Sequence, residues 1–206
     1  MQRPAVSNEP RPRGRPRNPD FETKILAAAA KLYGAHGWAG FNLDAVAREA
    51  GVGKSTIYAR WKTADSLLGA MIEQRWSALS TIDTGDLRQD LLAFGQLVLM
   101  RYIETGGGVV RHLRRDMITY PDLTAKITPM VERITQQAIA ILARGRQRGQ
   151  LREGVSLALA SDMLLSAMES QAGRIAADQN FDEMAVAKYV ARVVGLLMDG
   201  IAADCG

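Results

Sequence analysis

The sequence is poor in the residues that build disulfide frameworks, metal centres and β-sheets. Its only cysteine, Cys205, lies next to the last residue, so no disulfide can form within the chain and a reducing compartment is expected. Neither of its two histidines, His36 and His112, has cysteine, histidine or carboxylate partners at helical metal-ligand spacing that would complete a site. Aromatic residues make up only 6%, and no segment alternates valine, isoleucine, threonine and aromatic residues. These absences argue against a metal centre and favour helices over strands.

Long apolar runs and catalytic combinations are missing as well. No uncharged stretch approaches the roughly 18 residues that a membrane-spanning helix needs, and the N-terminal residues carry arginine and proline instead of a signal peptide's apolar core. The chain is therefore expected in the cytoplasm. No nucleophile, base and orienting residue occur together in a recognisable context, and no glycine loop follows a strand. The sequence thus predicts neither an enzyme nor a bound cofactor.

The chain does contain enough apolar sequence for a sizeable core, and its charge is concentrated at one end. Apolar residues account for 47% of the 206 residues, and leucine, alanine, methionine and arginine are abundant, which predicts an all-α fold. Residues 1–62 carry 11 Lys and Arg against 5 Asp and Glu, a net charge of +6, whereas residues 63–206 carry 15 against 17, a net charge of −2. The N-terminal part is therefore suited to a polyanion.

Residues 1–17 are predicted to be a disordered basic arm, because this segment of prolines and arginines has almost nothing apolar to bury. Around Gly14, the arginines at Arg13, Arg15 and Arg17 resemble the core of an AT-hook, whose extended chain lies in a narrow minor groove. A solubilising tail is the alternative. The segment that follows favours a DNA-contacting arm.

Residues 18–64 are predicted to form three helices. Asn18 and Pro19 suit a helix start, and apolar residues at helical spacing continue to about Gly37. Four residues of this first helix are expected to face a small core: Phe21, Ile25, Leu32 and Tyr33. Two aromatic residues in the following turn are expected to close that core: Trp38 and Phe41.

A helix-turn-helix is predicted next. Asn42 can cap a second helix by accepting from its free amides, and Asp44 in the first turn suits the helix dipole. Gly51 ends this helix after about two turns, and a short third helix begins at Gly53 or Lys54. The outer face of that third helix is left polar, as is typical of a helix in the DNA major groove, by Lys54, Ser55, Thr56, Tyr58 and Arg60.

A resemblance to a known family lies between Ala45 and Trp61, which read AVAREAGVGKSTIYARW. With the basic arm before it, this segment resembles the DNA-binding domain of the tetracycline-repressor (TetR) family of transcriptional regulators, over about residues 15–70. The resemblance implies base-edge or groove contacts from Lys54, Ser55 and Thr56. It implies phosphate contacts from Tyr58, Arg60 and the end of the second helix that holds Asn42 and Asp44. Family members commonly carry a lysine where this chain has Ala64, and Lys62 is the candidate replacement for that phosphate contact.

A competing interpretation uses the same residues. The sequence Gly53-Lys54-Ser55 matches the end of a phosphate-binding Walker loop. That motif also requires a glycine five residues before Gly53, where this chain has Arg48. Such loops also follow a strand, whereas this one follows a short helix. Nucleotide binding is therefore disfavoured.

Residues 65–206 are predicted to form a larger helical domain, which gives about nine helices in the whole chain. Turn residues interrupt the helical pattern at 84–86, 106–108, 120–122, 149 and 178–182. Pro129 either starts one of these helices or kinks a longer one. Arg111, Arg114 and Arg115 surround His112 and are interpreted as a solvated face.

The last two helices, at about 157–177 and 183–203, have wide apolar faces. Packing against the chain's own core accounts for part of these faces, and an interface with a second copy is the further possibility. TetR-family proteins pair these two helices in a four-helix bundle. The resemblance therefore implies a homodimer whose interface includes Leu164, Met168, Tyr189, Val193 and Leu197.

The resemblance implies a homodimeric transcriptional regulator, in such families most often a repressor, that binds a palindromic operator on duplex DNA and is released by a small-molecule effector. Its effector-binding pocket would lie among the fourth to eighth helices, with these candidates: Trp76, Phe94, Met100, Tyr102, Met117 and Met130. An apolar or aromatic effector is favoured because that interior offers few charges. The alternative is an architectural protein that coats DNA through its arginine arm without sequence preference.

Overall fold

The computed structural model describes residues 19–76, 82–104, 107–178 and 182–202. Within these ranges the chain forms nine helices and no strand, which confirms the predicted all-α fold. They are α1 (Pro19–Gly40), α2 (Leu43–Ala50), α3 (Lys54–Tyr58), α4 (Ala64–Trp76), α5 (Leu87–Ile103), α6 (Gly108–Thr119), α7 (Pro121–Gln147), α8 (Leu157–Asp178) and α9 (Glu183–Ile201). The arginines of the basic arm, Arg13, Arg15 and Arg17, lie outside the described residues, as does Cys205.

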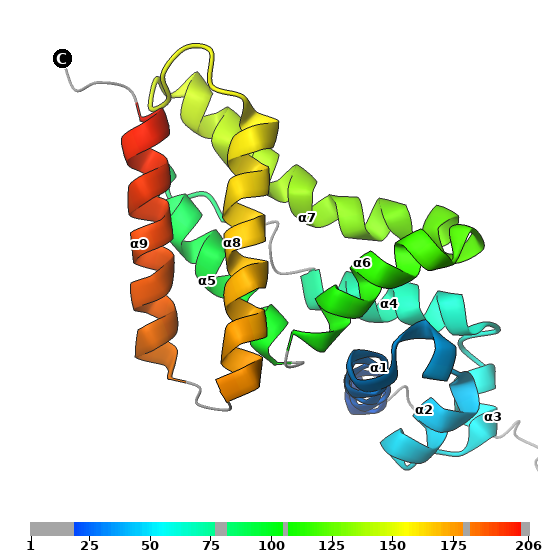
Figure 1. Ribbon diagram of the computed structural model, residues 1–206. Helices are drawn as coiled ribbons and strands as arrows, with labels where there is room; N and C mark the ends of the chain where they lie inside the picture. The colour runs from blue at the N-terminus through cyan, green and yellow to red at the C-terminus, as the bar shows by residue number, and fades with distance from the viewer. Residues whose placement is uncertain (1–18, 77–81, 105–106, 179–181, 203–206) are drawn as a thin grey trace, which may run out of the picture.

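The helices form two groups that α4 and α6 connect (Figure 1). One group is small and consists of α1, α2 and α3. In the other, α8 and α9 run side by side and pack against α5, while the long α7 covers α4, α5 and α8. None of the described helices is long and apolar enough to span a membrane.

The ends of α2 follow from the residues that flank it. The side-chain oxygen of Asn42 accepts a hydrogen bond from the backbone N–H of Ala45 at 2.8 Å, which satisfies one of the free amides of the first turn. At the other end Gly51 has a φ of 64°, and this left-handed conformation lets its N–H reach the carbonyls of Ala47 and Arg48. Both caps agree with the sequence-based prediction.

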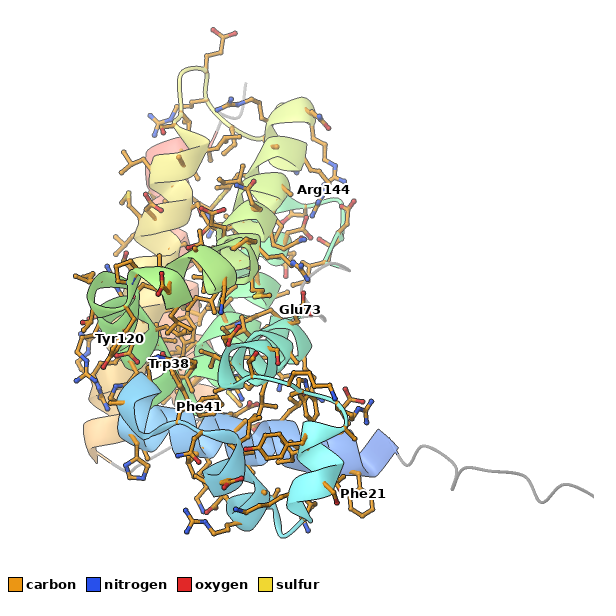
Figure 2. All side chains as sticks on the ribbon, turned by 90° about the vertical axis from the view of Figure 1, so that its right-hand side faces the viewer. Phe21, Trp38, Phe41, Glu73, Tyr120 and Arg144 are labelled. Atoms are coloured by element: carbon orange, nitrogen blue, oxygen red, sulfur yellow. The ribbon has the colours of Figure 1, made fainter. Side chains whose placement is uncertain are left out.

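In the first helix, α1, the sequence-based prediction is partly wrong. Gly37, with a φ of 64°, interrupts the helix where the sequence predicted its end, but helical residues continue to Gly40. Ile25 and Tyr33 are buried as expected, whereas Phe21 is 45% exposed instead of facing the core. Figure 2 shows Phe21 in the first turn of α1, at the edge of the molecule, where few neighbouring helices can cover it.

Helix α7 resolves the alternatives for Pro129. The helix is continuous from Pro121 to Gln147, so this proline lies inside one long helix and does not begin a new one. Its buried residues recur along one face of the helix: Leu123, Ile127, Ile134, Ala138, Ile141, Leu142 and Gly145. One helix therefore spans the core from the small helical group to the far end of α8.

Candidate nucleic-acid interface and buried cavity

Helices α2 and α3 have a buried side and an exposed side, as a helix-turn-helix requires. Val46, Ala50, Ile57 and Trp61 are buried, and Val52 between the helices is half-buried. The polar residues of α3 and its C-terminal end are all exposed: Lys54, Ser55, Thr56, Tyr58 and Arg60. The structure thus presents these five side chains on the surface, where DNA could reach them.

Asp44 organises the exposed surface of the two short helices. Its carboxylate accepts from the ammonium of Lys54 at 2.5 Å and from the hydroxyl of Tyr58 at 3.3 Å. The hydrogen bond from Lys54 is the main reason why the pKa of Asp44 is lower than usual. Through these two bonds, Asp44 holds Lys54 and Tyr58 in place on this surface.

The remaining cations of this surface are held by other contacts. Arg60 forms an ion pair with Glu22 and lies over the ring of Trp61, 5.6 Å from its centroid. The ammonium of Lys62 donates to the carbonyl oxygen of Tyr58 at 3.2 Å. Lys62 therefore lies at the C-terminal end of α3, close to the position where Ala64 lacks a cationic side chain.

A buried carboxylate in α6 joins the small helical group to the larger one, and sequence reasoning missed it. One oxygen of Asp116 accepts from the hydroxyl of Tyr33 at 2.9 Å and from the backbone N–H of Trp38 at 2.8 Å. Burial, and then the hydrogen bond to Asp116, raise the pKa of Tyr33. The break in α1 at Gly37 leaves the Trp38 amide available for this bond. Nothing in the sequence around Asp116 distinguishes it from a surface acid.

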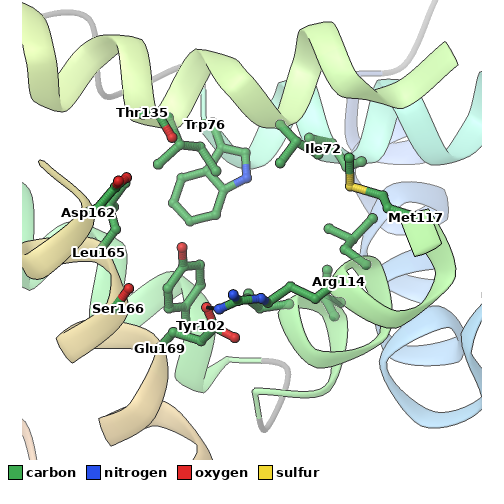
Figure 3. Close-up of a pocket in the computed structure, with 15 residues that line it drawn as sticks. Ile72, Trp76, Tyr102, Arg114, Met117, Thr135, Asp162, Leu165, Ser166 and Glu169 are labelled. Atoms are coloured by element: carbon green, nitrogen blue, oxygen red, sulfur yellow. Dashed lines mark hydrogen bonds and ion pairs between the residues drawn. The ribbon is translucent and has the colours of Figure 1, made fainter. Parts of the chain in front are cut away.

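A cavity of about 270 Å³ lies between α4, α5, α6, α7 and α8 and opens to the surface, where its lining residues Arg114, Asp162 and Ser166 are exposed. Three of the six predicted pocket residues line it: Trp76, Tyr102 and Met117. Figure 3 shows Trp76 and Tyr102 next to each other at one side of this space, where their rings pack edge to face with centroids 5.5 Å apart. The position of the cavity among the fourth to eighth helices thus agrees with the layout expected from the sequence.

The other three predicted pocket residues lie elsewhere. Phe94 is fully buried and belongs to the packed core around α5, about 12 Å along the helix from Tyr102. Met100 lies on the side of α5 that meets the start of α9, and Met130 packs over Gly69 on α4. Helical position alone therefore assigned these residues wrongly, because it does not indicate where the packing leaves space.

The cavity also contains more charge than the sequence led us to expect. Arg114, Asp162 and Glu169 are among its lining residues, and Arg114 forms an ion pair with Glu169 at 2.7 Å. Arg114 is nevertheless exposed, as are Arg111 and Arg115, so the three arginines form the solvated face that the sequence predicted. The expectation of a pocket with few charges is wrong at this side of the cavity.

Most of the predicted interface residues lie inside the single chain. Leu164, Met168 and Leu197 are buried, and the first two approach α5 at Gly95, so they have no surface left for a second copy. Tyr189 and Val193 are half-buried. The large apolar side chains that α8 and α9 expose are different ones: Leu159, Met163, Met184 and Leu196. The expectation for the three buried residues is therefore corrected.

Two family models match the chain. One, described as bacterial regulatory proteins of the tetR family, matches residues 25–71, which include α2 and α3. The other, described as a tetracyclin repressor-like C-terminal domain, matches residues 81–193, more than half of the chain and most of the cavity lining.

Individual proteins are similar over different lengths. An uncharacterized helix-turn-helix-type transcriptional regulator of Mycobacterium tuberculosis is 40% identical over 78 residues, which cover 37% of this chain and 39% of that protein. The match thus spans only about two fifths of that relative. The fatty acid metabolism regulator protein of Bacillus subtilis is 23% identical over 186 residues, or 86% of this chain and 94% of that protein.

Among solved structures, the fold is similar to that of the transcriptional regulator FadR from Bacillus subtilis in complex with stearoyl-CoA. The TM-score is 0.71 at 20% identity, over 86% of this chain and 98% of that one. Together with the two family models, this likeness accounts for both helical groups. The chain belongs to the tetracycline-repressor (TetR) family of helix-turn-helix transcriptional regulators and is not an enzyme.

Proposed function

We propose that this protein is an effector-responsive transcriptional repressor that acts in the cytoplasm and binds a near-palindromic operator as a homodimer. In this proposal residues 18–64 bind duplex DNA, residues 1–17 form a second, arginine-rich contact, and residues 65–206 bind the effector and dimerise. The observation that carries the proposal is the double role of α6, which lines the cavity with Val109, Leu113 and Arg114 and bonds to α1 through Asp116. A molecule in the cavity thus has a direct contact path to the helix-turn-helix.

The α3 side chains divide by the contacts they can make. Lys54, Ser55 and Thr56 occupy the first turn of α3, the part of a recognition helix that reaches base edges. Tyr58, Arg60 and Lys62 lie at its C-terminal end, and we assign them to phosphates, together with Asn42 at the start of α2. When DNA binds, phosphate and base acceptors replace Asp44 as partners of Lys54 and Tyr58.

Two substitutions separate base reading from phosphate binding. Lys54→Ala is expected to change the preferred base at one operator position, with a loss of roughly 1–3 kcal/mol of discrimination. Tyr58→Phe removes one phosphate donor and is expected to weaken binding to all sequences alike. Selection of bound sequences from a random DNA pool, followed by affinity measurement, gives both results. Arg133→Ala, which removes an exposed cation of α7 paired with Glu73, is the matched control and leaves both properties unchanged.

The same selection tests the proposed function as a whole. A regulator enriches a near-palindromic sequence, because the two recognition helices of a dimer enter successive major grooves about 34–36 Å apart. An architectural protein that binds through its arm enriches no sequence, and its uniform binding disappears as salt is raised. The second result would reject the repressor assignment.

We assign the dimer interface to the exposed apolar side chains of α8 and α9. Met163 is 56% exposed and Leu196 is 77% exposed, although these helices bury other large apolar side chains in the core, such as Leu164 and Val190. The two helices lie side by side (Figure 1), so those of a second copy can complete a four-helix bundle. The half-buried Tyr189 and Val193 remain part of the proposed interface.

A charge placed on this surface is expected to separate the dimer. In Met163→Glu/Leu196→Glu, association would bury unpaired carboxylates, so the protein sediments as a monomer and its operator affinity falls at least about a hundredfold. Ile118→Glu is the matched control, because Ile118 is an 86% exposed apolar residue at the end of α6. Analytical ultracentrifugation checks the prediction. A double variant that remains a dimer would place the interface on another surface.

The effector acts by population shift in this proposal. A molecule that fills the cavity stabilises one arrangement of α4 and α6, and DNA is released if that arrangement spaces the two recognition helices unsuitably. An apolar or aromatic part of the effector fits in the space beside the packed rings of Trp76 and Tyr102. The similar FadR structure contains stearoyl-CoA, which makes fatty acyl compounds the first class to test.

A further inference from the structure

A second hollow adjoins the effector cavity at the Arg114–Glu169 ion pair. It has a volume of about 260 Å³ and lies between α6 and α8. Three side chains line both spaces, Arg114, Ser166 and Glu169. Figure 3 shows Arg114 extending from α6 toward Glu169 on α8, at one side of the cavity. A ligand longer than the cavity can therefore continue past this ion pair into the second hollow.

The second hollow carries excess positive charge. Arg114 and Glu169 neutralise each other at 2.7 Å, but Arg111, which also lines the hollow, forms no ion pair with any described residue. The hydroxyl of Ser170, a further lining residue, accepts from the guanidinium of Arg174 at 2.9 Å, so another cation lies at the edge. Guanidinium and hydroxyl groups are the donors that proteins use to bind phosphate and carboxylate groups.

The cavity itself has the opposite preference. Its walls are mainly aliphatic and aromatic, and its lining includes Asp162, an exposed residue at the opening that forms no ion pair with a described residue. An anion placed inside would lose its hydration against these apolar walls and would approach Asp162 at the opening and, once Arg114 moved, Glu169 as well. The cavity is therefore suited to a neutral group, and an anionic group is suited to the second hollow.

The volume of the cavity limits the neutral part. At roughly 30 Å³ for each non-hydrogen group, the share of one water molecule in the liquid, 270 Å³ accommodates about nine such groups. An acyl chain of about eight carbons or a substituted aromatic acyl group has this size. A stearoyl chain is about twice as long, so about half of it would extend beyond the apolar walls of the cavity.

We infer that the effector is a medium-chain or aromatic acyl group esterified to a phosphorylated carrier, with the acyl group in the cavity and the phosphates at Arg111 and Arg114. This inference rests on the proposed effector response of the same cavity. The neutral ester or thioester linkage lies beside the Arg114–Glu169 ion pair, where the cavity meets the second hollow. This ion pair breaks when a phosphate replaces Glu169 as the partner of Arg114.

Calorimetric titration of the full chain with four probes tests this inference. Octanoyl-coenzyme A is expected to bind at least about tenfold more tightly than stearoyl-coenzyme A, octanoate or coenzyme A alone, because only it supplies both a fitting chain and distal phosphates. Arg111→Ala is expected to weaken octanoyl-coenzyme A about tenfold and to leave methyl octanoate unchanged, since the ester lacks phosphate. Arg88→Ala, an exposed arginine of α5, is the matched control and changes neither affinity.

Three results would overturn the inference: octanoate binding as tightly as octanoyl-coenzyme A, stearoyl-coenzyme A binding more tightly than it, or Arg111→Ala without effect on octanoyl-coenzyme A. Methyl octanoate separates this failure from failure of the proposed function. One outcome is that methyl octanoate binds and releases selected operator DNA while Arg111→Ala leaves the affinity for octanoyl-coenzyme A unchanged. In that case the effector response stands and the phosphate site is rejected. If molecules bind in the cavity and none changes operator affinity, the proposed effector response itself fails.

Discussion

Gly108→Ala is expected to lower the free energy of unfolding by about 3 kcal/mol, although alanine is the better helix former. Gly108 is the first residue of α6, and there its backbone touches the backbone of Gly34 in α1. A Cβ atom at Gly108 would lie 2.8 Å from the carbonyl carbon of Gly34 and still closer to the carbonyl oxygen. Both are backbone atoms that cannot rotate away, so the two helices must move apart.

Urea unfolding of the variant and of a matched glycine measures this effect. Gly200→Ala lies in α9, where a Cβ atom meets nothing within 4 Å, and is expected to stabilise the protein by roughly 0.5–1 kcal/mol through helix propensity. The two substitutions are chemically identical and differ in sign only if the contact between α1 and α6 is as tight as described. Equal stabilisation by both would contradict the close approach.

Local backbone chemistry explains which parts of the fold could be predicted from the sequence. Asn42 and Gly51 were assigned correctly because capping depends on a few adjacent residues. Phe21 was assigned wrongly because its spacing matches the core face, while burial depends on which helices cover that turn. The apolar periodicity of α8 likewise identified its buried stripe, with Leu164 and Met168, but not the exposed Met163 as the surface left for a partner.

The candidate sites were harder to predict because they depend on contacts between distant segments. Trp76 and Tyr102 were recognised as pocket residues, yet Phe94 on the same helix as Tyr102 is core, since a cavity exists only where side chains from five helices fail to meet. The role of Asp116 arises from Tyr33 and Trp38, about 80 residues earlier in the chain. A single sequence carries no sign of such a pairing.

The junction of α1 with α6 and α7 is the part of the molecule where a change in the cavity can reach the DNA-binding surface. Figure 2 shows Trp38 and Phe41 of the α1–α2 segment near Tyr120, between α6 and α7, and Trp38 and Tyr120 line a common depression. Asp116 lies one turn before the end of α6 and supplies the hydrogen bonds of this junction. These bonds fix α6 to α1, so a displacement of α6 moves the helix-turn-helix with it.

Asp116→Ala is therefore expected both to destabilise the protein and to uncouple effector binding from DNA release. It leaves the Tyr33 hydroxyl and the Trp38 N–H buried without an acceptor, at a cost of roughly 1–3 kcal/mol for each donor. Tyr33→Phe removes only one bond and leaves no unpaired donor, so it costs about 1 kcal/mol. Asp116→Asn keeps one oxygen that can accept from both donors, and its stability should lie near that of Tyr33→Phe.

The three variants separate a mechanical link from a merely stabilising contact. We measure the ratio of operator affinities with and without an effector that fills the cavity, at a temperature where each variant is folded. A link through Asp116 predicts that this ratio falls in the order wild type, Asp116→Asn, Asp116→Ala, because the remaining contact between α6 and α1 transmits less of the displacement. If Asp116→Ala is less stable but keeps the full ratio, coupling runs through α4, which also lines the cavity at Ile72 and Trp76 and leads directly from the recognition helix. The same measurement thus decides which of the two connecting helices carries the response.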